Sequence, residues 1–128
     1  MRLKIFQPSK IFLDEDVSKV VAESPAGSFG IRPRHLDMAS ALVPGILSYW
    51  AVRGQETYLA VNGGIFVKQG ETVCIATRMA VSGELGELNN RVAEFLSDVD
   101  EKERTSRSAL ARLEAAFVRR FMEFGKNA

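Results

Sequence analysis

Glycine and proline punctuate the first two thirds of this chain and almost vanish from the rest. All four prolines lie at or before Pro44, and nine of the ten glycines lie at or before Gly86. Both residues interrupt regular elements and serve tight turns, so the two parts must fold differently. The seam falls near the segment SGELG, and it predicts a first domain of residues 1–84 and a second of residues 85–128.

The first part shows short segments typical of half-buried strands. Turn residues separate these segments, and the Asn62-Gly63 pair predicts a hairpin turn because both residues tolerate positive φ. Many short strands at this spacing favour an antiparallel β-sandwich or barrel. The expected strands are Arg2–Gln7, Ile11–Leu13, Val17–Glu23, Ser28–Arg32, Ile46–Arg53, Glu56–Val61, Ile65–Gln69 and Thr72–Thr77.

The second part changes to a helical period. Two apolar stripes step by three and four positions, as in amphipathic helices, and the segment SDVDEKE separates them. Two such helices are expected to close as an antiparallel hairpin that leans on the β part or on a partner, which makes it a candidate mobile element. The stripes are Leu85, Leu88, Val92, Phe95 and Val99, then Leu110, Leu113, Phe117, Phe121 and Phe124.

Residues with catalytic or metal-binding chemistry are sparse. His35 is the single histidine, so a histidine-rich metal site cannot form, and we expect it to serve loop packing or partner contact. Asp37 is expected to orient His35 or to cap a turn. Cys74 lies in an apolar strand pattern and is expected to be a small buried hydrophobe. We therefore expect no catalytic residue, no metal site and no cofactor.

The charge balance narrows the classes of partner. A net charge of +1 at pH 7 argues against a nucleic-acid partner held by phosphate neutralisation. Arg112, Arg119 and Arg120 form either a solvated helix face or a contact with an acidic partner surface. The residues thus indicate a non-catalytic module that binds other proteins. Two alternatives stay open, a small β-barrel nucleic-acid-binding protein and a cupin-like ligand-binding module.

No segment indicates insertion into a membrane. The opening MRLKIFQPSK lacks the apolar core of a signal peptide. A run of about 18 apolar residues, which a spanning helix needs, is also missing. We expect a cytosolic protein or a peripheral subunit.

Two motifs carry a resemblance to a known family. The first runs from Gly27 to Gly45 and matches a Gly-x-Leu-Gly-x-x-Pro-x-His loop followed by a Leu-x-Pro-Gly lead-in. The second is YLAVNGGIFVKQGETVCIAT, from Tyr58 to Thr77. In this order and spacing they resemble the epsilon subunit family of rotary F-type ATP synthases, and the resemblance covers the whole chain. The first motif is matched by Gly27, Phe29, Gly30, Pro33, His35, Leu42, Pro44 and Gly45.

The resemblance implies an antiparallel β-sandwich of about ten short strands, followed by a two-helix hairpin. It implies a non-catalytic subunit of the central rotor stalk that binds the gamma subunit and the ring of c subunits, and that couples ion translocation to ATP synthesis or hydrolysis. Ser28, Arg34 and His35 would form a docking edge facing the ring. The C-terminal helices would reach the alpha/beta catalytic head and inhibit hydrolysis. The expected place is the cytoplasmic face of a bacterial or archaeal membrane, peripheral.

This chain departs from the family pattern at several positions. Arg34 replaces a usual glycine, Asn62 replaces a usual serine, and Arg78 stands where many members are acidic. Together these features suggest the alternate, N-type branch, some members of which pump sodium ions. Some bacterial relatives bind ATP through an Ile/Leu-Asp-x-x-Arg-Ala motif. Here Gly86 and Asn89 replace its aspartate and arginine, so we expect the subunit alone not to bind ATP.

Overall fold

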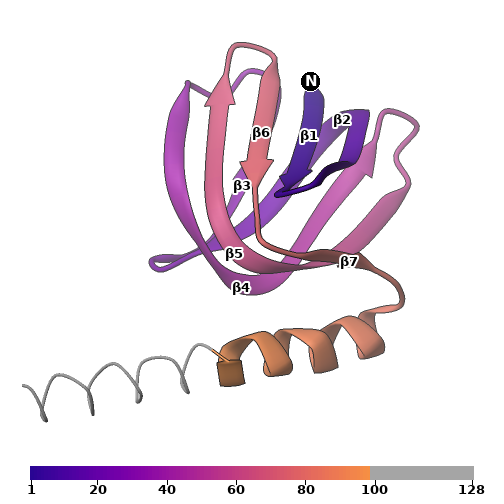
Figure 1. Ribbon diagram of the computed structural model, residues 1–128. Coiled ribbons are helices and arrows are strands. Elements are labelled where there is room, and N and C mark those ends of the chain that lie inside the picture. Colours follow the sequence, from indigo (N-terminus) through magenta and orange to yellow (C-terminus); the bar gives the residue numbers. More distant parts are fainter. Residues whose placement is uncertain (99–128) are drawn as a thin grey trace, which may run out of the picture. The chain divides into compact units, whose positions relative to one another are not determined.

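The computed structural model describes residues 1–98, which form seven strands and a helix (Figure 1). The second apolar stripe, Val99 and the three candidate arginines Arg112, Arg119 and Arg120 lie outside the described residues. The strands are β1 (Arg2–Gln7), β2 (Lys10–Ser24), β3 (Gly27–Ile31), β4 (Met38–Ala51), β5 (Glu56–Gln69), β6 (Thr72–Ala76) and β7 (Ala80–Ser82), and the helix covers residues 85–98.

The main sheet closes on itself. Neighbouring strands follow the order β1-β6-β5-β4-β2, and β1 also pairs with β2. The β1–β6 pairing is parallel, whereas β1–β2, β2–β4, β4–β5 and β5–β6 are antiparallel. β3 lies beside β2, and β7 lies beside β5. The predicted β domain is therefore confirmed as a closed, barrel-like sandwich, a form in which the main strands have no free edge.

The strands are fewer and longer than expected. Ile11–Leu13 and Val17–Glu23 belong to the single strand β2, and Glu56–Val61 and Ile65–Gln69 both belong to β5. β4 already begins at Met38, ahead of the expected start at Ile46. Long strands must bend to close a small sheet, so β2 and β5 each resemble two short segments in the sequence.

The hairpin prediction at Asn62-Gly63 is wrong. This pair lies inside β5, where Asn62 pairs with Pro44 and Gly64 pairs with Leu42 on β4. Gly63 and Gly64 have φ values of 67° and 129°, which glycine adopts at little steric cost. A Cβ on Gly64 would collide with the carbonyl oxygen of Ala76 on β6. The glycines therefore let β5 bend and approach β6 closely, and no chain reversal occurs there.

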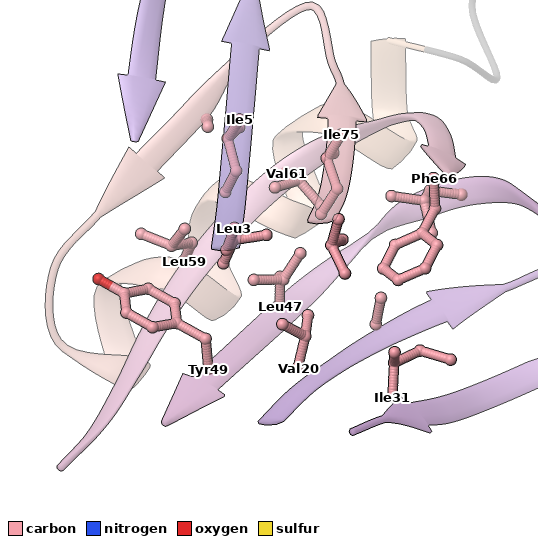
Figure 2. Close-up of a cluster of buried hydrophobic side chains, with 14 of the residues drawn as sticks. Leu3, Ile5, Val20, Ile31, Leu47, Tyr49, Leu59, Val61, Phe66 and Ile75 are labelled. Carbon is pink, nitrogen blue, oxygen red and sulfur yellow. The ribbon is translucent and has the colours of Figure 1, made fainter. Parts of the chain in front are cut away.

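Inward side chains of the strands form one hydrophobic core (Figure 2). Leu3 and Ile5 of β1 are fully buried, as are Phe66 of β5 and Ile75 of β6. The rings of Phe29 and Phe66 meet edge to face, with their centroids 5.0 Å apart, an arrangement that aromatic pairs favour. Along β1 and β6, buried residues alternate with half-buried ones, which is the two-residue period of a strand.

The helix of residues 85–98 packs on the outside of the barrel. Leu88 and Phe95 are buried against Ala60 of β5, with Ile46 of β4 and Val81 of β7 beside it. The predicted stripe is confirmed at Leu88, Val92 and Phe95, whereas Leu85 is 44% exposed. Met1–Phe95 form one compact unit, which includes this helix as far as Phe95. The predicted hairpin involves residues beyond those described.

A charge at the helix contact should release the helix. Leu88→Asp would place a carboxylate in an apolar contact, where an unpaired charge is costly, so opening of the helix is the cheaper response. We expect amide hydrogen exchange in residues 85–95 to accelerate by at least about tenfold. Leu85→Asp is the matched control, because Leu85 lies on the same helix but is 44% exposed. Equal acceleration in both variants would contradict the packing of Leu88.

Alanine at Gly64 should destabilise the protein more than alanine at Gly54. Both glycines have positive φ, 129° and 91°, so each alanine costs about 1–2 kcal/mol of backbone strain. Only Gly64→Ala adds a collision, since nothing lies within 4 Å of a Cβ at Gly54. We expect Gly64→Ala to cost at least about 2 kcal/mol more in urea unfolding of the full chain. Equal costs would mean that the β5–β6 approach is not tight.

Candidate docking surface

One outer side of the barrel carries a continuous row of apolar residues. Strand registers place Ala41, Ile65, Ala76 and Phe6 next to one another, and Phe6 is in turn paired with Ile11. Ile65 and Ile11 are 59% and 61% exposed. A parallel row runs through Ala39, Val67 and Cys74, and it reaches Lys4 on β1. We call these two rows, without Lys4, the apolar face.

The apolar face is not required by the fold. In a closed sheet the inward residues form the core, so outward positions are free to be polar. A second outward row, Ile46–Ala60–Val81, is covered by the helix of residues 85–98. A shallow hollow adjoins the apolar face at Ile65, and Phe6, Pro8 and Arg78 help to line it. Contiguous exposed apolar surface of this kind is typical of a protein-binding site.

Segment 32–37, between β3 and β4, forms an exposed loop at one end of the barrel. We call it the docking loop. Arg34 and His35 are both exposed, and Leu36 is 82% exposed. The backbone N–H of His35 donates to the carbonyl oxygen of Arg32 at 2.9 Å, which closes a tight turn. The imidazole Nδ1 lies 2.8 Å from the carbonyl oxygen of Leu36, so its partner is backbone and not a catalytic group.

Ser28 does not share this loop. It lies at the beginning of β3, whereas Arg34 and His35 follow the end of that strand. The span from Ser28 to Ile31 alone measures about 10 Å at the usual rise of a strand. The expected single docking edge therefore divides into an exposed position beside the β2–β3 turn and the docking loop. The predicted strand Ser28–Arg32 already implied this separation, which the resemblance to one motif did not take into account.

Two polar side chains tie the docking loop to the neighbouring turn between β5 and β6. The Lys68 Nζ donates to the carbonyl oxygens of His35 at 2.6 Å and of Gly70 at 2.7 Å. The Asp37 Oδ1 accepts from the backbone N–H of Gly70 at 2.8 Å. Of the two roles expected for Asp37, the structure supports capping a turn, since its partner is the β5–β6 turn.

Sequence reasoning missed Lys68 and the apolar face. Lys68 has the same inward parity on β5 as Phe66, and it is only 2% exposed. A lysine at an inward position of an alternating strand indicates that its amine has specific hydrogen-bond partners, and the sequence contained this signal. Cys74 is half-buried on the outer side of β6 and not in the core. Because Cys74 alternates with the buried residues Val73 and Ile75, its outward position could have been predicted from the sequence.

The described residues hold no candidate metal centre. Within residues 1–98, no three His, Cys, Asp or Glu side chains gather closely enough to bind a metal ion. No helix in the same range is long and apolar enough to cross a membrane.

A closed β-sandwich with an apolar outer face and a packed helix defines the structural class of this chain, a small β-sandwich module. Residues 1–83 match the family model described as ATP synthase, Delta/Epsilon chain, beta-sandwich domain. The chain belongs to this family, as an epsilon subunit of an F-type ATP synthase. The nucleic-acid-binding and cupin-like alternatives belong to other families.

Similar proteins agree with this assignment over most of the chain. The ATP synthase epsilon chain of Sulfurovum sp. is 31% identical, over 83% of this chain and 84% of the relative. The ATP synthase epsilon chain 2 of Cereibacter sphaeroides is 29% identical, over 95% and 86%. A chain of the Euglena gracilis mitochondrial ATP synthase superposes with a TM-score of 0.62 at 23% identity, covering 72% of this chain and 61% of that one. That last likeness concerns the fold alone.

Proposed function

We propose that this chain is a non-catalytic subunit of the rotor stalk, whose sandwich binds the gamma subunit and the ring of c subunits. Membership of the epsilon family supports this role. The observation that carries it is the apolar face, whose first row spans β4, β5, β6, β1 and β2 with apolar residues alone, while its second row ends beside Lys4. The core of a protein–protein interface is depleted of charge in the same way.

The gamma subunit is the partner that we assign to the apolar face. A stable stalk needs a permanent contact, and permanent interfaces are more apolar than transient ones. The row Ile46–Ala60–Val81 is also apolar and outward-facing, and the helix of residues 85–98 covers it. In the assembled stalk, gamma would cover the apolar face in the same manner.

The ring of c subunits is the partner that we assign to the polar candidates. Arg34, His35 and Ser28 are all exposed, and the docking loop carries Arg32 and Arg34 without an acid before Asp37. Because Ser28 and the docking loop are separate in the fold, we propose two ring contacts in place of one. Rotor torque would then act on two points of the sandwich.

The C-terminal helices form the regulatory part of the proposal. Arg112, Arg119 and Arg120 would meet acidic surface in the alpha/beta head and hold back ATP hydrolysis. The complex would stand at the cytoplasmic face of a bacterial or archaeal membrane, with this chain peripheral to it. Arg34 and Arg78 support assignment to the N-type branch.

An acidic residue on the apolar face should prevent gamma binding. Ile65→Glu would bury an unpaired carboxylate in the interface, at a cost of several kcal/mol, so affinity for purified gamma should fall by about 100-fold or more. Val52→Glu is the matched control, since Val52 is 69% exposed in the β4–β5 turn, away from the face. Calorimetric titration measures both. Unchanged affinity of Ile65→Glu would exclude the apolar face as the gamma site.

Removal of the three C-terminal arginines should release hydrolysis. The triple change Arg112→Ala, Arg119→Ala and Arg120→Ala should raise ATP hydrolysis by the assembled complex, because their charge attraction to the head is lost. The increase should shrink at high salt, where surface charges are screened. A triple change of the same arginines to Lys keeps the charge and serves as the control. Unchanged hydrolysis at low salt would mean that these arginines do not inhibit.

A further inference from the structure

Lys68 is the most deeply buried charged-type side chain among the described residues. It is 2% exposed, and Thr77 at 6% is the other buried polar residue in that range. Lys68 pairs with Met38 at the end of the β4–β5 ladder, where the docking loop enters β4. Lysine is almost never buried to this degree unless its amine has partners. Its position at the end of the barrel explains which partners it finds.

The Lys68 amine joins two backbone segments. One hydrogen bond goes to the His35 carbonyl oxygen in the docking loop, and one goes to the Gly70 carbonyl oxygen in the β5–β6 turn. An apolar residue at this position would leave both oxygens without this donor, and the connection between the loop and the turn would lose two hydrogen bonds. The amine therefore holds the loop and the turn at a fixed separation.

Asp37 makes the same connection in the opposite direction. Its carboxylate, which belongs to the loop, accepts from the N–H of Gly70 in the turn. The β5–β6 turn is also fixed from its other side, because the backbone N–H of Arg2 donates to the carbonyl oxygen of Glu71 at 2.7 Å. The docking loop and the β5–β6 turn thus form two walls that hydrogen bonds hold together.

An open hollow of about 700 Å³ lies between these walls. Pro33, His35 and Leu36 line it on the loop side, and Gly70 and Glu71 line it on the turn side, with Asp37 and Lys68 between them. This volume is within the range of ligand sites, but the hollow is too open to enclose a small molecule. It suits a protruding segment of a protein partner, which would meet apolar Leu36 and the charge of Glu71 together.

We propose that Lys68 is a positioning residue, which makes the docking loop and the β5–β6 turn one rigid docking edge. The occupant of the hollow is a segment of the ring of c subunits, because His35, the proposed ring contact, lines the hollow, so Glu71 contacts the ring together with His35 and Leu36. This inference rests on the proposed ring contact. The β5–β6 turn is then part of the contact surface. The docking loop is held in place by the side chain of Lys68, which does not itself touch the partner.

Limited trypsin digestion of the full chain tests the positioning role. Arg34 is an exposed cleavage site inside the docking loop, whereas the Arg32–Pro33 bond resists trypsin, and Arg53 in the β4–β5 turn is an internal reference site. In Lys68→Met, which keeps a similar apolar stem without the donors, cleavage at the loop should rise about tenfold relative to Arg53, as expected for the loss of two hydrogen bonds. Lys10→Met is the matched control, since Lys10 is exposed at the β1–β2 turn.

A second pair of variants keeps the test decisive if Lys68→Met folds poorly. Asp37→Ala removes the acceptor for Gly70 and should also speed cleavage of the loop, whereas Asp37→Asn retains an acceptor oxygen and should restore most of the protection. If neither Lys68→Met nor Asp37→Ala speeds loop cleavage, the positioning role is wrong.

Binding to the ring then separates this proposal from the broader one. Membranes stripped of the catalytic head and of gamma, which keep the ring of c subunits, are titrated with each variant and with His35→Ala, and the bound fraction is measured. Lys68→Met and Glu71→Ala should each weaken binding by about tenfold or more, and Lys10→Met should not. If Glu71→Ala binds normally while His35→Ala binds weakly, the ring contact stands but the two-walled edge is overturned. If all of these variants bind normally, the proposed ring contact fails at this end of the barrel.

Discussion

The pairing of β1 with two neighbours is the constraint on which the rest of this structure depends. β1 has six residues, yet it bonds to β2 on one side and to β6 on the other, and so joins the two ends of an otherwise open sheet. Its inward Leu3 and Ile5 fill the core, while its outward Phe6 continues the apolar face. Closure satisfies the backbone groups of the main strands, so contact with other proteins is left to side chains and loops.

β5 carries three structural features of the sandwich along one strand. In its first half, Ala60 lies outward under the helix of residues 85–98. After the bend at Gly63 and Gly64, Ile65 supplies the most exposed apolar side chain of that strand. At its end, Lys68 turns inward and holds the docking loop. Because one continuous strand carries all three features, a hydrogen-bonded ladder joins the docking-loop end of the barrel to the helix contact.

The sequence predicted best where one residue period governs a segment. β1 lies at its predicted bounds, and the helical stripe is correct at Leu88, Val92 and Phe95. The prediction failed at Asn62-Gly63, since residues that tolerate positive φ fit a hairpin turn and a bend inside a strand equally well. The resemblance implied one edge for Ser28 and His35, but β3, which the sequence had predicted as Ser28–Arg32, runs between them. Lys68 was overlooked, although its parity on the strand placed it with the core.

The sequence by itself determined the order of a β part and a helix, the membership of the epsilon family, and the scarcity of clustered catalytic side chains. These depend on local period, glycine and proline placement, and motif order, all of which are properties of the chain. Only the tertiary structure decided that β1 closes the sheet, that Ile65 and Ile11 share one exposed row, and that the Lys68 amine reaches the docking loop. The physical reason is that alternation gives each strand two faces but does not choose its neighbours. Neighbours are selected by pairing between segments distant in sequence, where the burial of the whole core outweighs any local preference.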